Sequence, residues 1–297
     1  MLASDGLLVF ADAEALVALK TDDGSVSWRL PLSEKLVASP VLSEGWLVVA
    51  TSTAVVALRS ADGTVAWHYN LESPVHGAPS ASRGLLFVPV ENGRVIALQL
   101  DTGEMVWERR VGGVPNDTRA VGDQVFVGSN DNFLYCLVAR DGRIDWRSRT
   151  GADVISAPVV DERRVYFISL DNVLRALNRG HGVQQWKRVL PFRPAWSVLR
   201  AADTLVVVGL AGAASAFYTK DGSPAAESRF GAGIELAGPL HGFETNLALG
   251  PIIVAVTRNL ATGATTITAA SRSIEPPLLP TVQPLPGAVN PAVAERR

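Results

Sequence analysis

The sequence predicts an all-β fold, a β-propeller of four-stranded blades, and two observations carry that prediction. A short frame returns along most of the 297 residues: a small residue and Leu, usually followed by Asp-Gly or Thr-Gly, and then Trp. Between its copies, short β-branched and apolar runs alternate with turn residues, as in strands joined by tight turns. A repeat of about forty residues with this content is the signature of a propeller. The frame glycines recur every 39 or 40 residues, at Gly24, Gly63, Gly103, Gly142, Gly182 and Gly222.

The first repeat is cut short at its beginning. Residues 1–11 align with residues 40–50, which puts Met1 in the middle of an innermost strand. The sequence opens with neither a basic segment nor an apolar leader, so it carries no recognisable signal peptide. We expect the true start to lie upstream, with an export signal and the rest of that strand. The alternative is that a strand from the C-terminal end completes the blade. We therefore expect seven blades, or eight if residues are missing upstream.

Each complete repeat reads as four strands. In the second repeat we expect strands at residues 37–42, 46–51, 55–59 and 65–69, where β-branched and apolar residues dominate. The Asp-Gly or Thr-Gly pair between the third and fourth strands suits a turn that needs positive φ. The aspartates of these pairs are thus expected to form turns and to have no catalytic role.

A tryptophan stands four residues after each of the first five frame glycines, on the outermost strand of its blade. One large flat side chain per blade is expected to dock against the neighbouring blade, and its truncation to alanine should cost about 3–5 kcal/mol. In the sixth copy Ala226 takes this position, so the sixth blade should be less firmly docked to the next. The structural docking residues are Trp28, Trp67, Trp107, Trp146 and Trp186.

The pattern degrades after Gly222. Residues 251–256 and 264–269 look like a hairpin around Thr262-Gly263, and we interpret them as part of a shortened or irregular seventh blade. Six prolines stand among the last 25 residues and preclude sheet or helix there. We expect a propeller over residues 1–272 and an extended, disordered tail over residues 273–297.

Composition narrows the function classes. Apolar residues make up 47% and charged residues 19% of the chain, and the net charge is −2, so no basic surface points to nucleic acid. The longest apolar runs are strand-sized, far below the roughly twenty residues of a transmembrane helix. The single cysteine, Cys136, rules out an internal disulfide and stands where the other repeats have alanine, so we expect a small buried residue.

The frame closely resembles the pyrroloquinoline-quinone-type propeller repeat with its tryptophan-docking motif. The likeness is good over residues 1–230 and poor over residues 231–272. Proteins sharing this repeat include quinoprotein dehydrogenases, the BamB lipoprotein of the outer-membrane assembly machinery and various sensor domains. The resemblance implies a propeller and a location in the periplasm or cell envelope, but it does not specify an activity.

Catalytic chemistry finds little support in the chain. The quinoprotein dehydrogenases that the repeat resembles use calcium, a catalytic aspartate and often a cysteine pair, whereas this chain has one cysteine and no calcium-loop spacing. The four histidines show no spacing typical of metal ligands, and no nucleophile elbow or phosphate loop is present. We expect no catalytic residue, no metal site and no cofactor.

The propeller axis offers the best candidate site. When the innermost strands are aligned at their proline, the preceding residue is small in most blades, as a crowded channel requires, but two blades break the pattern. One presents Asn116, Asp117 and Arg119, and the other presents Arg193 and Trp196. With His76, these side chains would face one channel mouth and bind a ligand or a partner peptide. The alternative is an internal ion pair and a core tryptophan.

Together these observations predict a non-catalytic scaffold that binds protein partners, similar to BamB, with envelope assembly components among those partners. A rigid loop face and exposed strand edges would present the binding surface. An upstream signal would also allow a lipid anchor. Two alternatives stay open: a quinone-dependent oxidoreductase or its remnant, and a sensor that binds a small ligand at the channel mouth.

Overall fold

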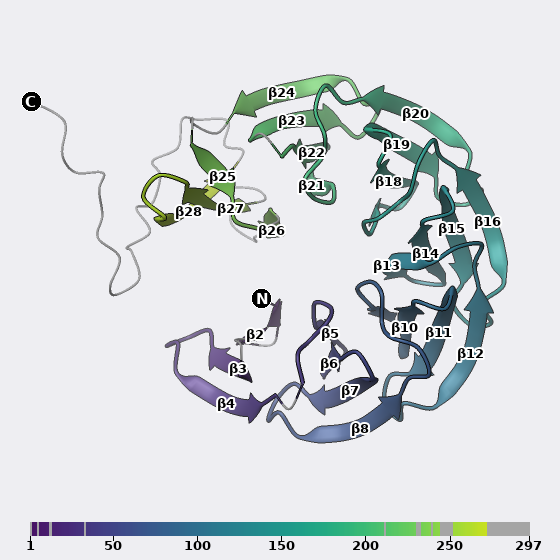
Figure 1. Ribbon diagram of the computed structural model, residues 1–297, viewed down its shortest axis with the longest axis vertical. Helices are drawn as coiled ribbons and strands as arrows, with labels where there is room; N and C mark the ends of the chain where they lie inside the picture. The colour runs from purple at the N-terminus through teal and green to yellow at the C-terminus, as the bar shows by residue number, and fades with distance from the viewer. Residues whose placement is uncertain are drawn as a thin grey trace, which may run out of the picture.

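The protein folds into seven antiparallel four-stranded sheets arranged around a common centre (Figure 1). This computed structural model describes residues 2–4, 6–11, 14–32, 34–210, 212–229, 233–238, 240–243 and 252–271. All of its regular elements within these ranges are strands, which confirms the all-β propeller class. The count of seven sheets is consistent with the expected seven blades. The predicted tail over residues 273–297 lies outside the described residues.

The first three sheets follow one another along the chain. Sheet 1 contains β1 (Leu2–Ser4), β2 (Leu7–Ala11), β3 (Ala15–Lys20) and β4 (Val26–Pro31). Sheet 2 contains β5 (Val41–Ser43), β6 (Trp46–Ala50), β7 (Ala54–Arg59) and β8 (Val65–Asn70). Sheet 3 contains β9 (Ser80–Ser82), β10 (Leu85–Val90), β11 (Arg94–Gln99) and β12 (Met105–Arg110).

The next three sheets repeat this order. Sheet 4 contains β13 (Pro115–Val121), β14 (Gln124–Ser129), β15 (Phe133–Val138) and β16 (Ile144–Arg149). Sheet 5 contains β17 (Val159–Val160), β18 (Arg164–Ser169), β19 (Val173–Asn178) and β20 (Gln184–Val189). Sheet 6 contains β21 (Leu199–Ala201), β22 (Thr204–Val208), β23 (Ala213–Tyr218) and β24 (Pro224–Arg229).

Sheet 7 departs from the pattern. It contains β25 (Ile234–Leu236), β26 (His241–Phe243), β27 (Ile252–Asn259) and β28 (Thr265–Ser271). β25 and β26 pair one after the other along the same edge of β27, and β28 pairs with the other edge. β27 and β28 form the hairpin that the sequence predicts. The sheet is thus only three strands wide at any point.

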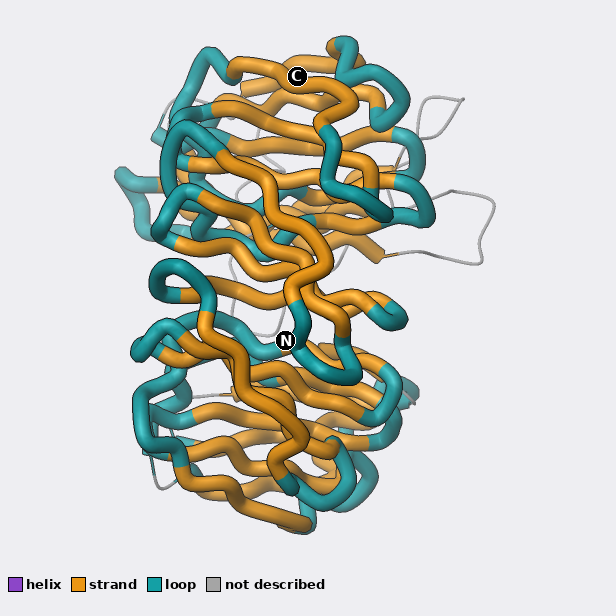
Figure 2. The backbone as a smooth tube through the Cα atoms, turned by 90° about the vertical axis from the view of Figure 1, so that its right-hand side faces the viewer, coloured by secondary structure: helices purple, strands orange, loops and turns teal. Residues whose placement is uncertain are grey.

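The sheets form an open arc, with sheet 1 at one end and sheet 7 at the other (Figure 1). In sheets 1 to 6 the first strands lie toward the centre, and the fourth strands, such as β8 and β20, form the rim. In the edge-on view, strands cross the disc and loops gather at its two faces (Figure 2). The loops therefore present two separate surfaces for binding.

The innermost strands are shorter than predicted. β5 begins at Val41, not at residue 37, because Pro40 has no N–H to donate to a neighbouring strand. β13 is the exception, since Thr118 replaces the proline and its N–H donates to the Ala78 carbonyl at 3.0 Å. That bond ties sheet 4 to sheet 3, and the pairing of Pro115 with Ser129 of β14 extends the strand back to Pro115.

One cross-strand register recurs in the first six sheets. In sheet 5, Tyr166 of β18 pairs with Ala176 of β19, which pairs with Trp186 of β20. The middle residue is small because the indole lies beside it in the ladder. In sheet 4 this middle position is Cys136, which is fully buried as predicted, and burial raises the pKa of its thiol to about 12.

Each of the five frame tryptophans joins its sheet to the next one. The ring of Trp107 covers Gly142 of sheet 4 so closely that a Cβ on this glycine would lie 2.5 Å from the ring. The indole nitrogens donate to backbone carbonyls of the following sheet at 2.9 Å for Trp28 to Ser60, 2.9 Å for Trp67 to Leu100, 2.7 Å for Trp107 to Ala139, 3.0 Å for Trp146 to Arg179 and 3.1 Å for Trp186 to Thr219. We call each such contact between neighbouring sheets a seam.

Candidate functional site

Loops from several sheets meet around a cavity of about 410 Å³, which we call the axial cavity. Its lining includes Ser39 before sheet 2, Asp117 of sheet 4, Ile155 and Leu170 of sheet 5, and Trp196 before sheet 6. Sheets 2, 4, 5 and 6 lie on different sides of the arc, so a cavity that all of them line must lie at its centre (Figure 1). Ser39, Asp117 and Ser197, which share one position in the proline alignment, all line it.

Asp117 bridges three sheets at this cavity. One carboxylate oxygen accepts the N–H of Ala78 at 2.8 Å, and the other accepts the N–H of Ala157 at 3.4 Å. Ala78 and Ala157 occupy the same aligned position in sheets 3 and 5. The carboxylate therefore holds its neighbours around the axis while it also lines the cavity.

Asn116 has a structural role in the protein interior. Its side chain is buried and donates from Nδ2 to the Val154 carbonyl at 2.9 Å. A Cβ on Gly77 would lie 2.4 Å from the carbonyl carbon of Asn116, so the two sheets touch backbone to backbone here. This close approach leaves no room for a side chain at Gly77.

Trp196 provides the largest apolar surface at the cavity. Its side chain is 40% exposed, so it is not the core tryptophan of the alternative interpretation. Backbone bonds hold the loop that carries it, because the Ala195 N–H donates to the Val208 carbonyl at 2.8 Å. Ile155 and Leu170, exposed by 52% and 40%, extend the apolar wall.

Sequence reasoning missed Ile155 and Leu170. Ile155 stands three residues before the aligned proline, the position that His76 holds in another blade. Leu170 stands in a turn where other repeats have Glu91 and Asn130. Leu210 holds the same turn position in sheet 6 without lining the cavity, so an apolar residue in this turn does not by itself mark the site.

The other three predicted residues do not line the axial cavity. Arg119 and Arg193 are exposed, and within the described ranges no ion pair joins either of them to Asp117. His76 is also exposed, and its Nδ1 lies 4.0 Å from Oε1 of Glu91. The structure brings Asp117 and Trp196 together, and leaves Arg119, Arg193 and His76 outside.

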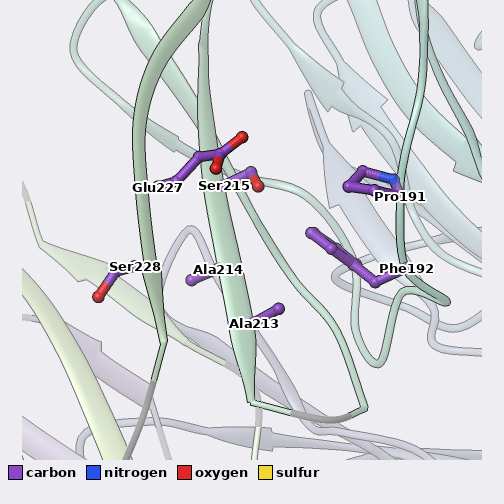
Figure 3. A pocket seen from close by; sticks show the side chains of 7 residues that line it. All are labelled: Pro191, Phe192, Ala213, Ala214, Ser215, Glu227 and Ser228. Carbon is purple, nitrogen blue, oxygen red and sulfur yellow. The ribbon is translucent and has the colours of Figure 1, made fainter.

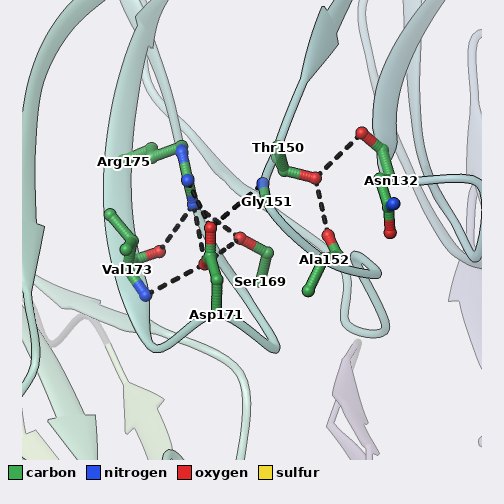
Figure 4. A network of polar contacts seen from close by, with 8 residues as sticks. All are labelled: Asn132, Thr150, Gly151, Ala152, Ser169, Asp171, Val173 and Arg175. Carbon is green, nitrogen blue, oxygen red and sulfur yellow. Dashed lines mark hydrogen bonds and ion pairs between the residues drawn. The ribbon is translucent and has the colours of Figure 1, made fainter.

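A polar network fixes the wall that carries Leu170 (Figure 4). Nη1 of Arg175 donates to Oδ1 of Asp171 at 3.0 Å and to Oγ of Ser169 at 2.5 Å. The Gly151 N–H also donates to Asp171, at 3.1 Å, which ties in the loop from sheet 4. Burial alone would raise the pKa of Asp171, but the hydrogen bonds from Arg175 and Ser169 outweigh it and lower the pKa to about 2.

A second cavity of about 280 Å³ lies beside the loop that carries Trp196. Phe192 and Pro191 face Ser215 and Ala213 across it (Figure 3). A Cβ on Gly209 would lie 2.6 Å from the Phe192 ring, so this ring packs directly on the strand end. Phe192 thereby anchors the loop that presents Trp196 at the axial cavity.

The axial cavity combines an apolar wall with serine hydroxyls and one carboxylate, a lining that suits binding and orientation. Across the part of the chain that the structure describes, no group of three or more His, Cys, Asp or Glu side chains converges to hold a metal ion. Within the same ranges, no helix is long and apolar enough to cross a membrane.

Fold and site together define a β-propeller whose sheets are joined by tryptophan seams and whose loops surround an axial cavity. The chain belongs to the family described as outer membrane protein assembly factor BamB, whose profile matches residues 2–121 and 112–237. This membership confirms the resemblance to BamB-like propeller repeats.

Two curated relatives carry the same description. BamB of Yersinia pestis is 28% identical over 137 residues, which cover 42% of this chain and 35% of the relative. BamB of Escherichia coli K12 is 30% identical over 108 residues, which cover 32% of this chain and 27% of the relative. The chain thus aligns with about a third of the length of these relatives.

Three solved structures share the fold at low sequence identity. BamB from Moraxella catarrhalis has a TM-score of 0.56 and 17% identity, over 88% of this chain and 93% of that one. The designed protein Ika8 has a TM-score of 0.75 and 13% identity, over 90% and 81%. A quinohemoprotein alcohol dehydrogenase from Pseudomonas putida HK5 has a TM-score of 0.57 and 14% identity, over 77% and 52%. At these identities the likeness concerns the fold alone.

Proposed function

We propose that this protein is a non-catalytic scaffold of the bacterial cell envelope that binds a protein partner of outer-membrane assembly at the axial cavity. The observation that carries the proposal is the exposed apolar wall of Trp196, Ile155 and Leu170. Apolar side chains exposed together on anchored loops are typical of interaction sites. Aromatic anchors such as tryptophan supply much of the energy of protein interfaces.

The lining indicates how such a partner would be held. The apolar wall would bury an aliphatic or aromatic side chain, and the hydroxyls of Ser39 and Ser197 would bond to its backbone. Asp117 holds the neighbouring loops of sheets 3 and 5 through Ala78 and Ala157, so little ordering of these loops is needed on binding. The envelope location rests on family membership and on the relatives named as outer membrane protein assembly factors.

The test is site-specific photo-crosslinking in the native host. A photoreactive amino acid would replace Trp196, and in a matched control it would replace Val189, which is 74% exposed on the rim strand β20. We expect an adduct with an outer-membrane assembly protein from position 196 and none from position 189. Absence of an adduct at 196, or the same adducts at both positions, would contradict the proposal.

A second function, a sensor for a small ligand, is favoured by the cavity volume of about 410 Å³. This volume falls within the roughly 300–1,000 Å³ of small-molecule sites. A thermal-shift screen of envelope metabolites against the wild type and Trp196→Ala separates the two functions. A ligand response that is lost in Trp196→Ala would favour the sensor.

A bound quinone with calcium does not match the donors of the axial cavity. Calcium takes about six to eight oxygen ligands, several of them carboxylates. Asp117 is the one carboxylate in the described lining, and both of its oxygens already accept backbone N–H groups. Reconstitution with the quinone and Ca²⁺, followed by dye-linked alcohol oxidation, tests this conclusion, and we expect no activity.

A further inference from the structure

A cavity of about 260 Å³, open to solvent at the exposed Ala226, lies between sheet 6 and sheet 7, and we call it the seam cavity. Val206, Ala216 and Ala226 line it from sheet 6, and Ile253 of β27 lines it from the other side. These three residues of sheet 6 are direct cross-strand neighbours, on β22, β23 and β24. The seam cavity therefore lies over one continuous ladder of small and medium-sized side chains.

This ladder is the counterpart of the tryptophan ladder in the other seams. Val206, Ala216 and Ala226 take the places of Tyr166, Ala176 and Trp186 in sheet 5. On the sheet 6 side the cavity thus lies over the position where the other five seams hold an indole ring, and Ala226 is the residue that leaves this position unfilled.

The receiving side of the seam has also kept its local structure. In sheet 6 the Thr219 N–H donates to the Asp203 carbonyl, and the Thr219 carbonyl accepts the Trp186 indole. In sheet 7 the Leu260 N–H donates to the Gly233 carbonyl in the same way, three residues before the turn glycine Gly263. A Cβ on Gly263 would meet no atom within 4 Å, whereas the glycines of the filled seams lie under an indole. Leu260 and Gly263 do not themselves line the seam cavity, which sheet 7 borders through Ile253.

Size and chemistry suit an aromatic ring. An apolar cavity of about 150 Å³ can stay dry and bind benzene, so about 260 Å³ has room for a two-ring indole. Most of the lining is alanine, valine and isoleucine. The hydroxyl of Thr204 already donates to the Ala201 carbonyl at 2.8 Å. Tyr218 adds an aromatic ring with a hydroxyl group to the lining.

We propose that the seam cavity is a binding site for an indole-type aromatic ring. The ring would occupy the position over Ala226 that the tryptophans occupy in the other seams. This site is separate from the axial cavity and does not depend on the proposed scaffold function.

The test uses free indole as the probe and the thermal unfolding midpoint of the full chain as the readout. We expect indole to raise the midpoint of the wild type by about 2 °C near saturation. Ala226→Trp should raise the midpoint without ligand and abolish the indole response, because the new side chain fills the cavity. Ala66→Trp, an exposed position on the rim strand β8, is the matched control and should keep the full response.

A positive control comes from a seam that already holds tryptophan. Trp186→Ala should lower the midpoint and create a second response to indole, since it opens an equivalent space. The proposal is overturned if indole stabilises Trp186→Ala but not the wild type, or if Ala226→Trp responds to indole as the wild type does.

A second ligand tests whether the aromatic ring belongs to a tryptophan side chain of another chain or to a free compound. N-acetyl-tryptophanamide carries the same indole together with a peptide backbone. Stabilisation of the wild type by both compounds would assign the site to a tryptophan side chain presented by another chain. Stabilisation by indole alone would assign it to a free aromatic compound.

Discussion

The indole nitrogen of Trp107 lies 2.7 Å from the carbonyl oxygen of Ala139 on the next sheet. Beside that bond, the six-membered part of the same indole covers the turn glycine Gly142. Hydrogen bond and ring contact thus meet at one turn, and the same pair of contacts recurs in four other seams. The sheets are joined near the rim by a contact that a single residue type supplies.

Truncating Trp107 should therefore destabilise the fold, and two substitutions separate the contribution of the hydrogen bond from that of the ring. Trp107→Phe removes the N–H and leaves the Ala139 carbonyl without this donor, which should cost about 1–3 kcal/mol. Trp107→Ala removes the ring as well and should cost about 3–5 kcal/mol. Urea unfolding of the purified chain measures both, and equal losses would show that the hydrogen bond contributes nothing.

The turn glycines should respond differently to alanine according to what covers them. Gly142 and Gly24 both have positive φ, at 67° and 71°, so alanine strains the backbone at each, by about 1 kcal/mol. Only at Gly142 would the new Cβ also collide with a tryptophan ring, whereas at Gly24 nothing lies within 4 Å. We expect Gly142→Ala to lower the unfolding midpoint several times more than Gly24→Ala, and similar shifts would contradict the close ring contact.

Stability should fall in acid through Asp171. Its pKa is lowered to about 2 in the folded protein from the ordinary 3.8, so its contribution is fully present above about pH 4 and is lost as the pH falls toward 2. The lost contribution is about 2 kcal/mol for a shift of this size. Unfolding measured from pH 6 down to pH 2.5 should show a smaller decline for Asp171→Asn than for the wild type, and parallel declines would rule out this carboxylate as the source.

Asp117 should matter for the order of the axial loops. Asp117→Asn replaces one acceptor oxygen by an NH₂ group that faces a backbone N–H, and the lost bond should cost about 1–3 kcal/mol. Hydrogen exchange at the Ala78 and Ala157 amides should become faster, because these amides donate to the carboxylate. The Trp28 indole, which bonds to Ser60 in a distant seam, should exchange at an unchanged rate and serves as the internal control.

The sequence by itself determined the repeat, the fold class and the positions of the seam tryptophans. These features depend on local patterns that recur along the chain. The patterns are turn glycines, short apolar runs and one small residue opposite each tryptophan. Cys136 is a clear case, since its alignment with the alanines of other repeats was enough to predict burial. The hairpin of β27 and β28 was also predictable, because a strand, a tight turn and a strand are adjacent in the chain.

Only the tertiary structure decided which side chains share a site. Ser39, Asp117 and Trp196 come from three sheets and meet around one cavity, whereas Arg119, two residues after Asp117 in the chain, does not line it. The seam cavity likewise depends on how β27 packs against sheet 6, although Ala226 marked its position in the sequence. The physical reason is that a repeat specifies the contacts inside each sheet, while the space between sheets depends on how side chains from distant parts of the chain fill it.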